Sequence, residues 1–210
     1  QELKEGKGYI KEYYYNGDIK FEGEYLNGER KGKGKKYDKR GNLKFEGEYL
    51  NNKKYNGVGY DNKNKIIYKL EKGKGLVKKY YENGEIKSEN EYIFGETNGK
   101  GKEYYHNIVI FEGIYLCDQK KKGKQFINEY VEYEGEFLYG KKWTGKGYDK
   151  DHETIYELIN GTGIINEYNN ECRLIYEGDY LNGKKHGKGK EYYERGRLIY
   201  EGEYLNGVKH

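Results

Sequence analysis

Short stretches of the chain alternate between aromatic or apolar residues and charged residues. In residues 198–204, the first set is Leu198, Tyr200, Gly202 and Tyr204, and the glutamates Glu201 and Glu203 lie between them. Successive side chains of a β-strand point to opposite faces of its sheet. The alternation therefore predicts a half-buried strand with an aromatic inner face and a charged, solvated outer face.

A five-residue motif within this stretch recurs along the chain: an aromatic residue, Glu, Gly, any residue and a second aromatic residue. Its copies begin at Phe21, Phe45, Phe111, Tyr133, Tyr176 and Tyr200, and a weaker copy begins at Ser88. A Gly-x-Gly motif follows most copies by about ten residues, beginning at Gly6, Gly32, Gly57, Gly73, Gly99, Gly145, Gly161 and Gly187, with a degenerate copy at Gly123. Self-similarity of this kind predicts one continuous array of about nine units over residues 1–210.

Each unit is predicted to be a β-hairpin. Asn-Gly dipeptides, in which both residues tolerate positive φ, are the strongest short-range hairpin signal. They begin at Asn16, Asn27, Asn56, Asn83, Asn98, Asn160, Asn182 and Asn206. Glycine recurs too often for a long helical run, and the absence of proline leaves every strand able to donate its backbone hydrogen bonds. We therefore expect an all-β fold without helix.

Two units are shorter than the others. The Gly-x-Gly motifs at Gly57 and Gly73 are 16 residues apart, as are those at Gly145 and Gly161. The two short units are offset by 88 residues, which indicates that a block of several units was duplicated. We expect tight hairpins in the short units and an irregular sheet near residues 57–75 and 120–165.

Residues 176–189 read YEGDYLNGKKHGKG, and this stretch resembles the MORN (membrane occupation and recognition nexus) repeat. The shared features are the alternating aromatic, Gly and aromatic residues, then Asn-Gly-Lys, then Gly-x-Gly. The resemblance implies an elongated, single-layer, twisted antiparallel sheet of stacked hairpins, with glycines and aromatic rings lining a groove. The sequence departs from the family pattern in its two short units, in the Gly123 copy, and in having Tyr where the family often has Trp.

Composition supports this picture and narrows it. The 210 residues include 28 Tyr and 32 Gly but no Met, and only 34% are hydrophobic, so tyrosine must supply much of the packing. The 40 basic and 36 acidic residues nearly cancel to a net charge of +4, which argues against a nucleic-acid partner. Cys117 and Cys172 are expected to be free thiols.

The mean hydropathy of −1.26 and the absence of an apolar run of about 18 residues argue against a membrane-spanning segment. No signal peptide is recognisable in residues 1–30. We expect a cytoplasmic protein, with association to the cytoskeleton or to a membrane surface left open. Because there is no initial Met and the pattern is still in progress at His210, we also expect a segment of a longer chain.

Carboxylates two residues apart on a strand lie about 6.5 Å apart, within the range of an inverting glycosidase pair. Such pairs, for example Glu201 and Glu203, recur in several hairpins on the solvated face, where Lys188 and Lys190 can pair with them. Residues 187–190 lack phosphate-loop spacing. His106, His152, His186 and His210 share no metal-ligand spacing. We expect no enzyme activity, catalytic residue, cofactor, metal or small-molecule substrate.

The predicted function is a structural scaffold that mediates protein–protein interaction or end-to-end assembly, with other proteins or further copies of itself as partners. The candidate contact residues are the groove aromatics Tyr25, Tyr49, Tyr92, Tyr115, Phe137, Tyr180 and Tyr204. Packing within the sheet is the alternative role for these rings.

The alternative function is peripheral binding to an anionic phospholipid or phosphoinositide membrane. Each lysine near an anionic surface contributes about 1 kcal/mol. The candidate lipid-contacting residues are Lys33, Lys35, Lys120, Lys121, Lys184 and Lys185. Glutamates interleaved with these lysines offset the attraction, which is why the scaffold is preferred.

Overall fold

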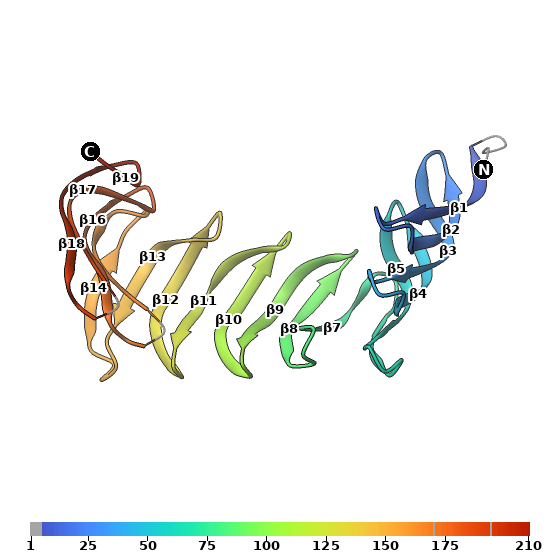
Figure 1. The fold of residues 1–210 in the computed structure, drawn as a ribbon, viewed down its shortest axis with the longest axis horizontal. Coiled ribbons are helices and arrows are strands. Elements are labelled where there is room, and N and C mark those ends of the chain that lie inside the picture. The colour runs from blue at the N-terminus through green and yellow to red at the C-terminus, as the bar shows by residue number, and fades with distance from the viewer. Residues whose placement is uncertain (1–5, 170, 194) are drawn as a thin grey trace. The chain divides into compact units, whose positions relative to one another are not determined.

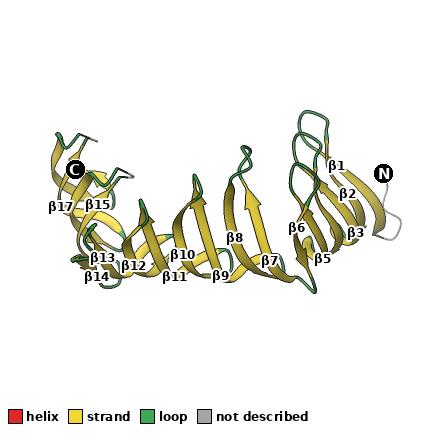
Figure 2. Cartoon of the chain, turned by 90° about the horizontal axis from the view of Figure 1, so that it is seen from below, coloured by secondary structure: helices red, strands yellow, loops and turns green. Residues whose placement is uncertain are grey.

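The structure, a computed structural model, describes residues 6–169, 171–193 and 195–210. These residues form strands joined by turns, and Figure 2 shows no helix among them. Consecutive strands pair antiparallel, which confirms the prediction of an all-β fold of sequential hairpins. The chain divides into two compact units, unit 1 (Gln1–Gly99) and unit 2 (Lys100–His210), and the division falls within strand β9 (Glu96–Tyr105).

Unit 1 contains a six-stranded antiparallel sheet in which each strand pairs with the next one along the chain (Figure 1). Its strands are β1 (Lys7–Tyr13), β2 (Ile19–Leu26), β3 (Glu29–Tyr37), β4 (Leu43–Leu50), β5 (Lys53–Tyr60) and β6 (Ile66–Leu70). A further antiparallel pair follows, formed by β7 (Lys74–Tyr80) and β8 (Ile86–Ile93).

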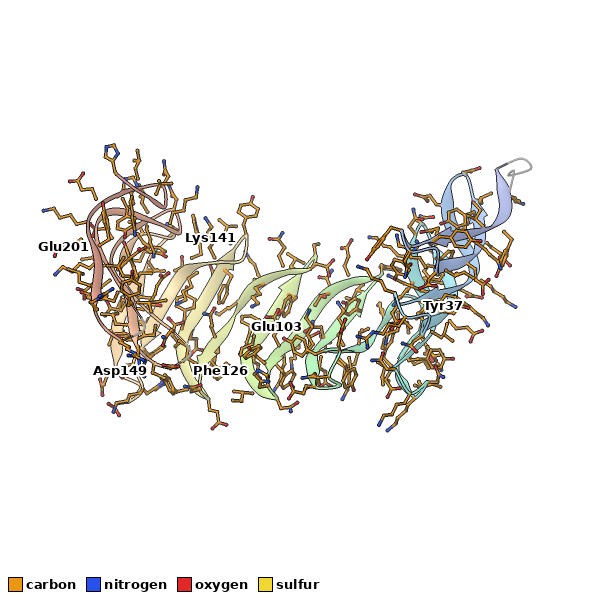
Figure 3. The ribbon with its side chains drawn as sticks, in the orientation of Figure 1. Tyr37, Glu103, Phe126, Lys141, Asp149 and Glu201 are labelled. Carbon is orange, nitrogen blue, oxygen red and sulfur yellow. The ribbon has the colours of Figure 1, made fainter. Side chains whose placement is uncertain are left out.

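Unit 2 repeats the same topology in two ladders. The first ladder consists of β10 (Ile108–Leu116), β11 (Gln119–Ile127), β12 (Tyr130–Leu138), β13 (Lys141–Tyr148) and β14 (Thr154–Leu158). The second consists of β15 (Gly163–Tyr168), β16 (Leu174–Leu181), β17 (Lys184–Tyr192), β18 (Leu198–Leu205) and β19 (Val208–Lys209). Lys141, labelled in Figure 3, is the first residue of β13, and Asp149, also labelled, directly follows its last residue.

The ladder of backbone hydrogen bonds is interrupted inside both short units. Between β6 and β7 an isolated bridge joins Glu71 and Lys74, and between β14 and β15 an equivalent bridge joins Ile159 and Thr162. Two backbone hydrogen bonds close each four-residue turn, with N···O distances of 2.9 Å in the first and 3.0 Å in the second. The irregularity expected near residues 57–75 and 120–165 is therefore present at these turns, which are themselves 88 residues apart.

Several Asn-Gly dipeptides form the turns predicted for them. Asn182 and Gly183 have φ of 53° and 69°, and Asn206 and Gly207 have φ of 54° and 91°. The prediction is wrong at Asn56, which lies inside β5, and at Asn98, which lies inside β9. At both places the glycine belongs to the Gly-x-Gly motif and serves a strand, with φ of 147° at Gly57 and 112° at Gly99. The turns before these strands are made by 51–52 and 94–95 instead.

Pairs of glycines face each other across neighbouring strands and form a floor for an aromatic ring. Gly113 is paired with Gly123, and a Cβ added to Gly113 would lie 2.7 Å from the Gly123 Cα and 2.8 Å from the Phe111 ring. Phe111 itself is fully buried. The glycines therefore allow a ring to lie flat against a one-layer sheet, as close backbone approach requires.

The rings pack edge to face from hairpin to hairpin. In unit 1 the Phe21 and Tyr49 centroids are 5.0 Å apart with an interplanar angle of 85°. In unit 2 the Phe111 and Phe137 centroids are 5.4 Å apart at 83°. Aromatic pairs prefer such edge-to-face geometry. Each hairpin therefore buries its apolar surface against its neighbours, as in other repeat proteins.

Cross-strand ion pairs cover the opposite, outer face. Lys35 lies 3.2 Å from Glu46, and Lys190 lies 3.5 Å from Glu201, which is labelled in Figure 3. The predicted pairing of Lys190 with a glutamate of the neighbouring strand is thus confirmed. Exposed pairs of this kind contribute little to stability. The outer face is therefore a charged, solvated surface.

The glycine floor leads to a first prediction. Gly113→Ala places a Cβ 2.3 Å from the Lys122 carbonyl oxygen, and we expect it to lower the free energy of unfolding by about 3 kcal/mol. Gly140→Ala in a turn of the same unit has open space at its Cβ and only a positive φ of 76° to overcome, which costs about 1 kcal/mol. Urea unfolding measures the free energy of unfolding of both variants. Equal losses of stability would show that the position beneath the ring does not require glycine.

Candidate functional site: the ring–cation cells of the inner face

The inner face repeats one arrangement of four side chains, which we call a ring–cation cell. A cell has a first ring, a second ring four residues later, a cation five residues after the second ring, and a carboxylate. In the Phe21 cell these are Phe21, Tyr25, Arg30 and Glu12. The strand register places Glu12 opposite Phe21 and Arg30 opposite Tyr25. A register shift between Gly23 and Tyr25 is needed for the second pairing.

The four side chains of the Phe21 cell contact one another. The Arg30 guanidinium lies 4.2 Å from the centroid of the Phe21 ring and donates to both Glu12 carboxylate oxygens at 2.6 and 2.7 Å. The Tyr25 hydroxyl donates to the same carboxylate. Burial by itself raises the pKa of Glu12, but the hydrogen bonds from Tyr25 and Arg30 outweigh it and lower the pKa below its ordinary value. The carboxylate thus satisfies both donors while the cation covers the ring.

The Tyr176 cell in unit 2 has the same geometry. Lys185 Nζ lies 4.1 Å from the centroid of the Tyr176 ring, and the Tyr180 hydroxyl donates to Glu167 at 2.5 Å. Lys185 is also 3.7 Å from Glu167 and 2.9 Å from Glu191 of the next cell. Glu191 is therefore shared between neighbouring hairpins.

The Phe111 cell is built from Glu103, Tyr115 and Lys120. Lys120 Nζ lies 4.3 Å from the centroid of the Phe111 ring and 2.9 Å from Glu103, and the Tyr115 hydroxyl donates to Glu103 at 2.6 Å. Glu103, on β9, is labelled in Figure 3.

The Tyr133 cell takes its carboxylate from a different strand position. Gln125 stands opposite Tyr133, where other cells have a glutamate. Glu132, immediately before the first ring and only 3% exposed, receives hydrogen bonds from Lys142 and, at 3.1 Å, from the Tyr156 hydroxyl. A cell can therefore obtain its carboxylate from either of two positions.

The Phe45 cell contains no carboxylate. Lys36 stands opposite Phe45, and Tyr49 and Lys54 supply the second ring and the cation. Lys54 Nζ lies 4.6 Å from the Phe45 centroid and 2.7 Å from the hydroxyl oxygen of Tyr68. Within the described ranges, neither lysine is within ion-pair distance of an acidic group, and the buried Tyr49 hydroxyl has no hydrogen-bond partner. This cell therefore has two lysines and a buried hydroxyl without a partner, but no carboxylate.

The seven groove aromatics predicted to bind a partner are the second rings of this inner face. Tyr49, Tyr115, Phe137 and Tyr204 are buried, whereas Tyr25, Tyr92 and Tyr180 are half-buried. Those that follow a first ring pack against it, as Tyr25, Tyr115 and Tyr180 do, whereas Tyr92, which follows Ser88, packs against the core of unit 1. Packing thus accounts for their positions, and a role in binding a partner stays a prediction.

The structure does not bring the six candidate lipid-contacting lysines onto one face. Lys120 and Lys185 lie in cells on the inner face, next to glutamates. Lys35 pairs with Glu46 on the outer face. The others, Lys33, Lys121 and Lys184, are exposed.

Sequence reasoning missed the cations and carboxylates of the cells, although a signal was present. A cation follows the second ring by five residues at Arg30, Lys54, Lys120, Lys142, Lys185 and Lys209. The buried Thr97 occupies the same place after Tyr92. The constant spacing predicts the cation once the ring is known.

No group of three or more His, Cys, Asp or Glu side chains in the described ranges is placed to hold a metal ion. No helix there has the length and hydropathy that crossing a membrane requires. Cys117 and Cys172 are free thiols, as predicted.

The sequential hairpins, glycine floors and stacked tyrosines define an all-β hairpin-repeat protein. More specifically, the chain contains MORN repeats: the sequence model of the MORN repeat family matches residues 21–43, 176–196 and 200–210. Each matched segment contains both rings and the cation of one cell. A comparison with curated proteins gave no match.

The shared carboxylate Glu191 leads to a second prediction. Burial raises its pKa, but hydrogen bonds from Lys209 and Lys185 outweigh burial and lower the pKa to about 2, from an ordinary value of 4.5. A carboxylate with a lowered pKa stabilises the fold above pH 4.5 and loses this contribution as the pH falls toward 2. Glu191→Gln should therefore be destabilised relative to wild type at neutral pH but not near pH 2.

Urea unfolding at a series of pH values measures this difference. Glu201→Gln on the exposed outer face is the matched control and should differ little from wild type at any pH. A difference for Glu191→Gln that does not shrink on acidification would contradict the shared role of Glu191.

Proposed function

We propose that this MORN-repeat chain is a non-catalytic scaffold that binds a protein partner along its turn edge in unit 2. The turn edge is the series of tight turns that follow the second rings. The observation that supports it is a recurring exposed apolar residue at these turns: Leu116 (54% exposed), Tyr139 (80%), Leu181 (38%) and Leu205 (50%). Leu116, Leu181 and Leu205 directly follow a second ring, and Tyr139 lies one position further along its turn. Single exposed apolar residues are ordinary, but a series of them along one edge is typical of a contact surface.

Hydrogen bonds between neighbouring hairpins keep parts of this edge together. The Gly183 N–H donates to the Gly161 carbonyl at 2.9 Å, and the Gly161 N–H donates to the Trp143 carbonyl at 2.6 Å. The Gly207 N–H donates to the Lys185 carbonyl at 2.8 Å in the same way. A partner could therefore contact several hairpins at once, which adds their contributions without a deep pocket.

The charges of the sheet favour binding over catalysis. The recurring carboxylate pairs lie on the outer face, where glutamates such as Glu46, Glu134 and Glu201 have cross-strand lysine partners. The inner carboxylates Glu12, Glu103 and Glu167 accept hydrogen bonds from tyrosines and lie next to cations. Both sets of carboxylates are engaged in structural contacts, which favours a role in binding another protein or a second copy of this chain.

The alternative function is binding to a membrane surface through the six candidate lipid-contacting lysines. Lys35, Lys120 and Lys185 are already near glutamates, which reduces the charge that they offer to a lipid headgroup. The apolar turn edge is therefore the better-supported contact surface.

The scaffold proposal predicts that the turn edge, and not exposed apolar surface in general, carries the interaction. A triple variant, Leu116→Ser, Tyr139→Ser and Leu205→Ser, should reduce recovery of a specific partner about tenfold, because apolar anchors dominate protein interfaces. The matched control replaces three exposed outer-face residues, Ile114, Ile164 and Ile199, by Ser. Affinity capture with quantitative mass spectrometry compares the variants, and sedimentation velocity tests self-association.

Partner recovery or self-association that the turn-edge variant loses and the control retains would support the proposal. Equal behaviour of the two triple variants, or a monomer that captures nothing specific, would overturn it.

A further inference from the structure

We propose that the Phe45 cell of unit 1 binds an anion with a multivalent phosphate group, which takes the place of the carboxylate found in other cells. This inference is independent of the proposed scaffold function, because it concerns a cavity in unit 1 and not the turn edge of unit 2. It rests on the strand register, on a buried hydroxyl without a partner, and on the charge of the cavity.

The strand register shows which residue has been replaced. Glu12 stands opposite Phe21, Glu167 opposite Tyr176, and Glu191 opposite both Tyr176 and Tyr200. The residue opposite Phe45 on β3 is Lys36, so the sign of the charge at this place is reversed.

The second position from which a cell can obtain its carboxylate also carries a positive charge here. In the Tyr133 cell the acid comes from Glu132, immediately before the first ring. The residue immediately before Phe45 is Lys44, whose Nζ is hydrogen-bonded to Asn62 Oδ1 at 2.7 Å. Both positions that supply an acid elsewhere are therefore lysines in this cell.

The donors that normally meet the carboxylate are still present. In the Phe21 and Tyr176 cells the second-ring hydroxyl donates to the glutamate that the cation also approaches. In the Phe45 cell the Tyr49 hydroxyl is buried without a partner among the described residues, and the half-buried Lys54 lies over the ring. An unpaired buried donor is costly. An anion would accept from the Tyr49 hydroxyl and give Lys54, which now donates only to the neutral Tyr68 hydroxyl oxygen, a charged partner.

These side chains line a cavity of about 1320 Å³ whose charge is strongly positive. Ten lysines and two arginines line it, against three carboxylates. Asp38 and Asp61 accept backbone N–H groups of their own turns, and Glu82 pairs with Arg40 at 2.8 Å. Among the lining cations, Arg30, Lys53 and Lys78 pair with glutamates outside the lining. The excess positive charge of the cavity therefore comes from the other lysines, which include Lys36, Lys54 and Lys79.

The number of cations selects the class of ligand. Lys36, Lys54 and Lys79 all line the cavity, and the pKa of Lys54 is lowered first by burial and then by the charges of its lysine neighbours. A single carboxylate neutralises one of them, whereas a pyrophosphate or a similar polyphosphate group offers several charges. Lysine ammonium groups bind phosphate oxygens as point charges, and partial burial strengthens the attraction.

Binding of the anion should be coupled to protonation of the Lys54 amine. Burial, followed by the charges of Lys36, Lys79 and Lys44, lowers the pKa of Lys54 from 10.5 to about 7. The groups that face Lys54 are thus three lysines, with the Tyr68 hydroxyl in hydrogen-bond contact. An anion favours the protonated amine, so its binding should take up a proton above pH 7 and weaken as the pH rises.

Isothermal titration calorimetry with sodium pyrophosphate tests the site. Lys36→Glu restores the carboxylate of the other cells, and we expect it to weaken pyrophosphate binding about thirtyfold or more while keeping or raising the thermal midpoint. Lys33→Glu makes the same change of charge on the exposed outer face of β3 and should bind within about threefold of wild type. Equal loss in the two variants, or no binding by wild type, would overturn the proposal.

Titrations above pH 7 in buffers of different ionisation enthalpy measure the proton. Wild type should take up a proton on binding, and Lys54→Met should bind more weakly and without this uptake. Pyrophosphate binding that is insensitive to both Lys36→Glu and Lys54→Met would show an adventitious ion only.

A second probe distinguishes a lipid headgroup from a soluble polyphosphate as the ligand. Phosphatidylcholine vesicles with a minor share of phosphatidic acid present a phosphate monoester at a membrane surface. Binding of wild type but not of Lys36→Glu to these vesicles identifies a lipid headgroup as ligand, whereas binding to pyrophosphate alone identifies a soluble polyphosphate. Failure with both probes contradicts the anion site and leaves the turn-edge scaffold unaffected.

Discussion

The structure depends on one constraint: an aromatic ring must lie flat on a sheet that has no second layer to cover it. Facing glycines such as Gly113 and Gly123 provide the floor beneath the ring. The cation five residues after the second ring provides the cover, as Lys120 does above Phe111 at 4.3 Å. A carboxylate then balances the cation, so that ring, charge and hydrogen bonds form one structural unit. A charged residue thus does the work that an apolar layer does in a β-sandwich.

Most of the fold could be predicted from the sequence because its signals are local. Alternation along residues 198–204 shows a strand and its two faces, and Asn182-Gly183 shows the turn before the next strand. Asn56-Gly57 misled because the dipeptide permits positive φ and does not say whether a turn or a bulge uses it. Only the neighbouring strands decide this, and they place Asn56 within β5.

The candidate site was less accessible to sequence reasoning. The second rings were identified, and the cations were within reach because their spacing is constant. The carboxylates were not, because Glu12 and Glu167 come from the preceding strand, and each register contains a shift that sequence does not specify. For the same reason Lys36 looks like one lysine among many until β3 is aligned opposite Phe45. The meaning of a charge in this protein is set by the strand across from it.

The interrupted ladders at Glu71–Lys74 and Ile159–Thr162 have a consequence for how such a chain can change over generations. Where backbone hydrogen bonds run on without a break, inserting or removing a hairpin disturbs the register of both neighbours. At these two turns the ladders on either side are joined by an isolated bridge and by the backbone hydrogen bonds that one glycine, Gly73 or Gly161, makes to its neighbours. Cutting and rejoining the chain there therefore breaks few backbone hydrogen bonds. The two turns are one duplication length apart. A block of hairpins copied or lost between these turns would therefore disturb few of the backbone hydrogen bonds that hold the rest of the sheet.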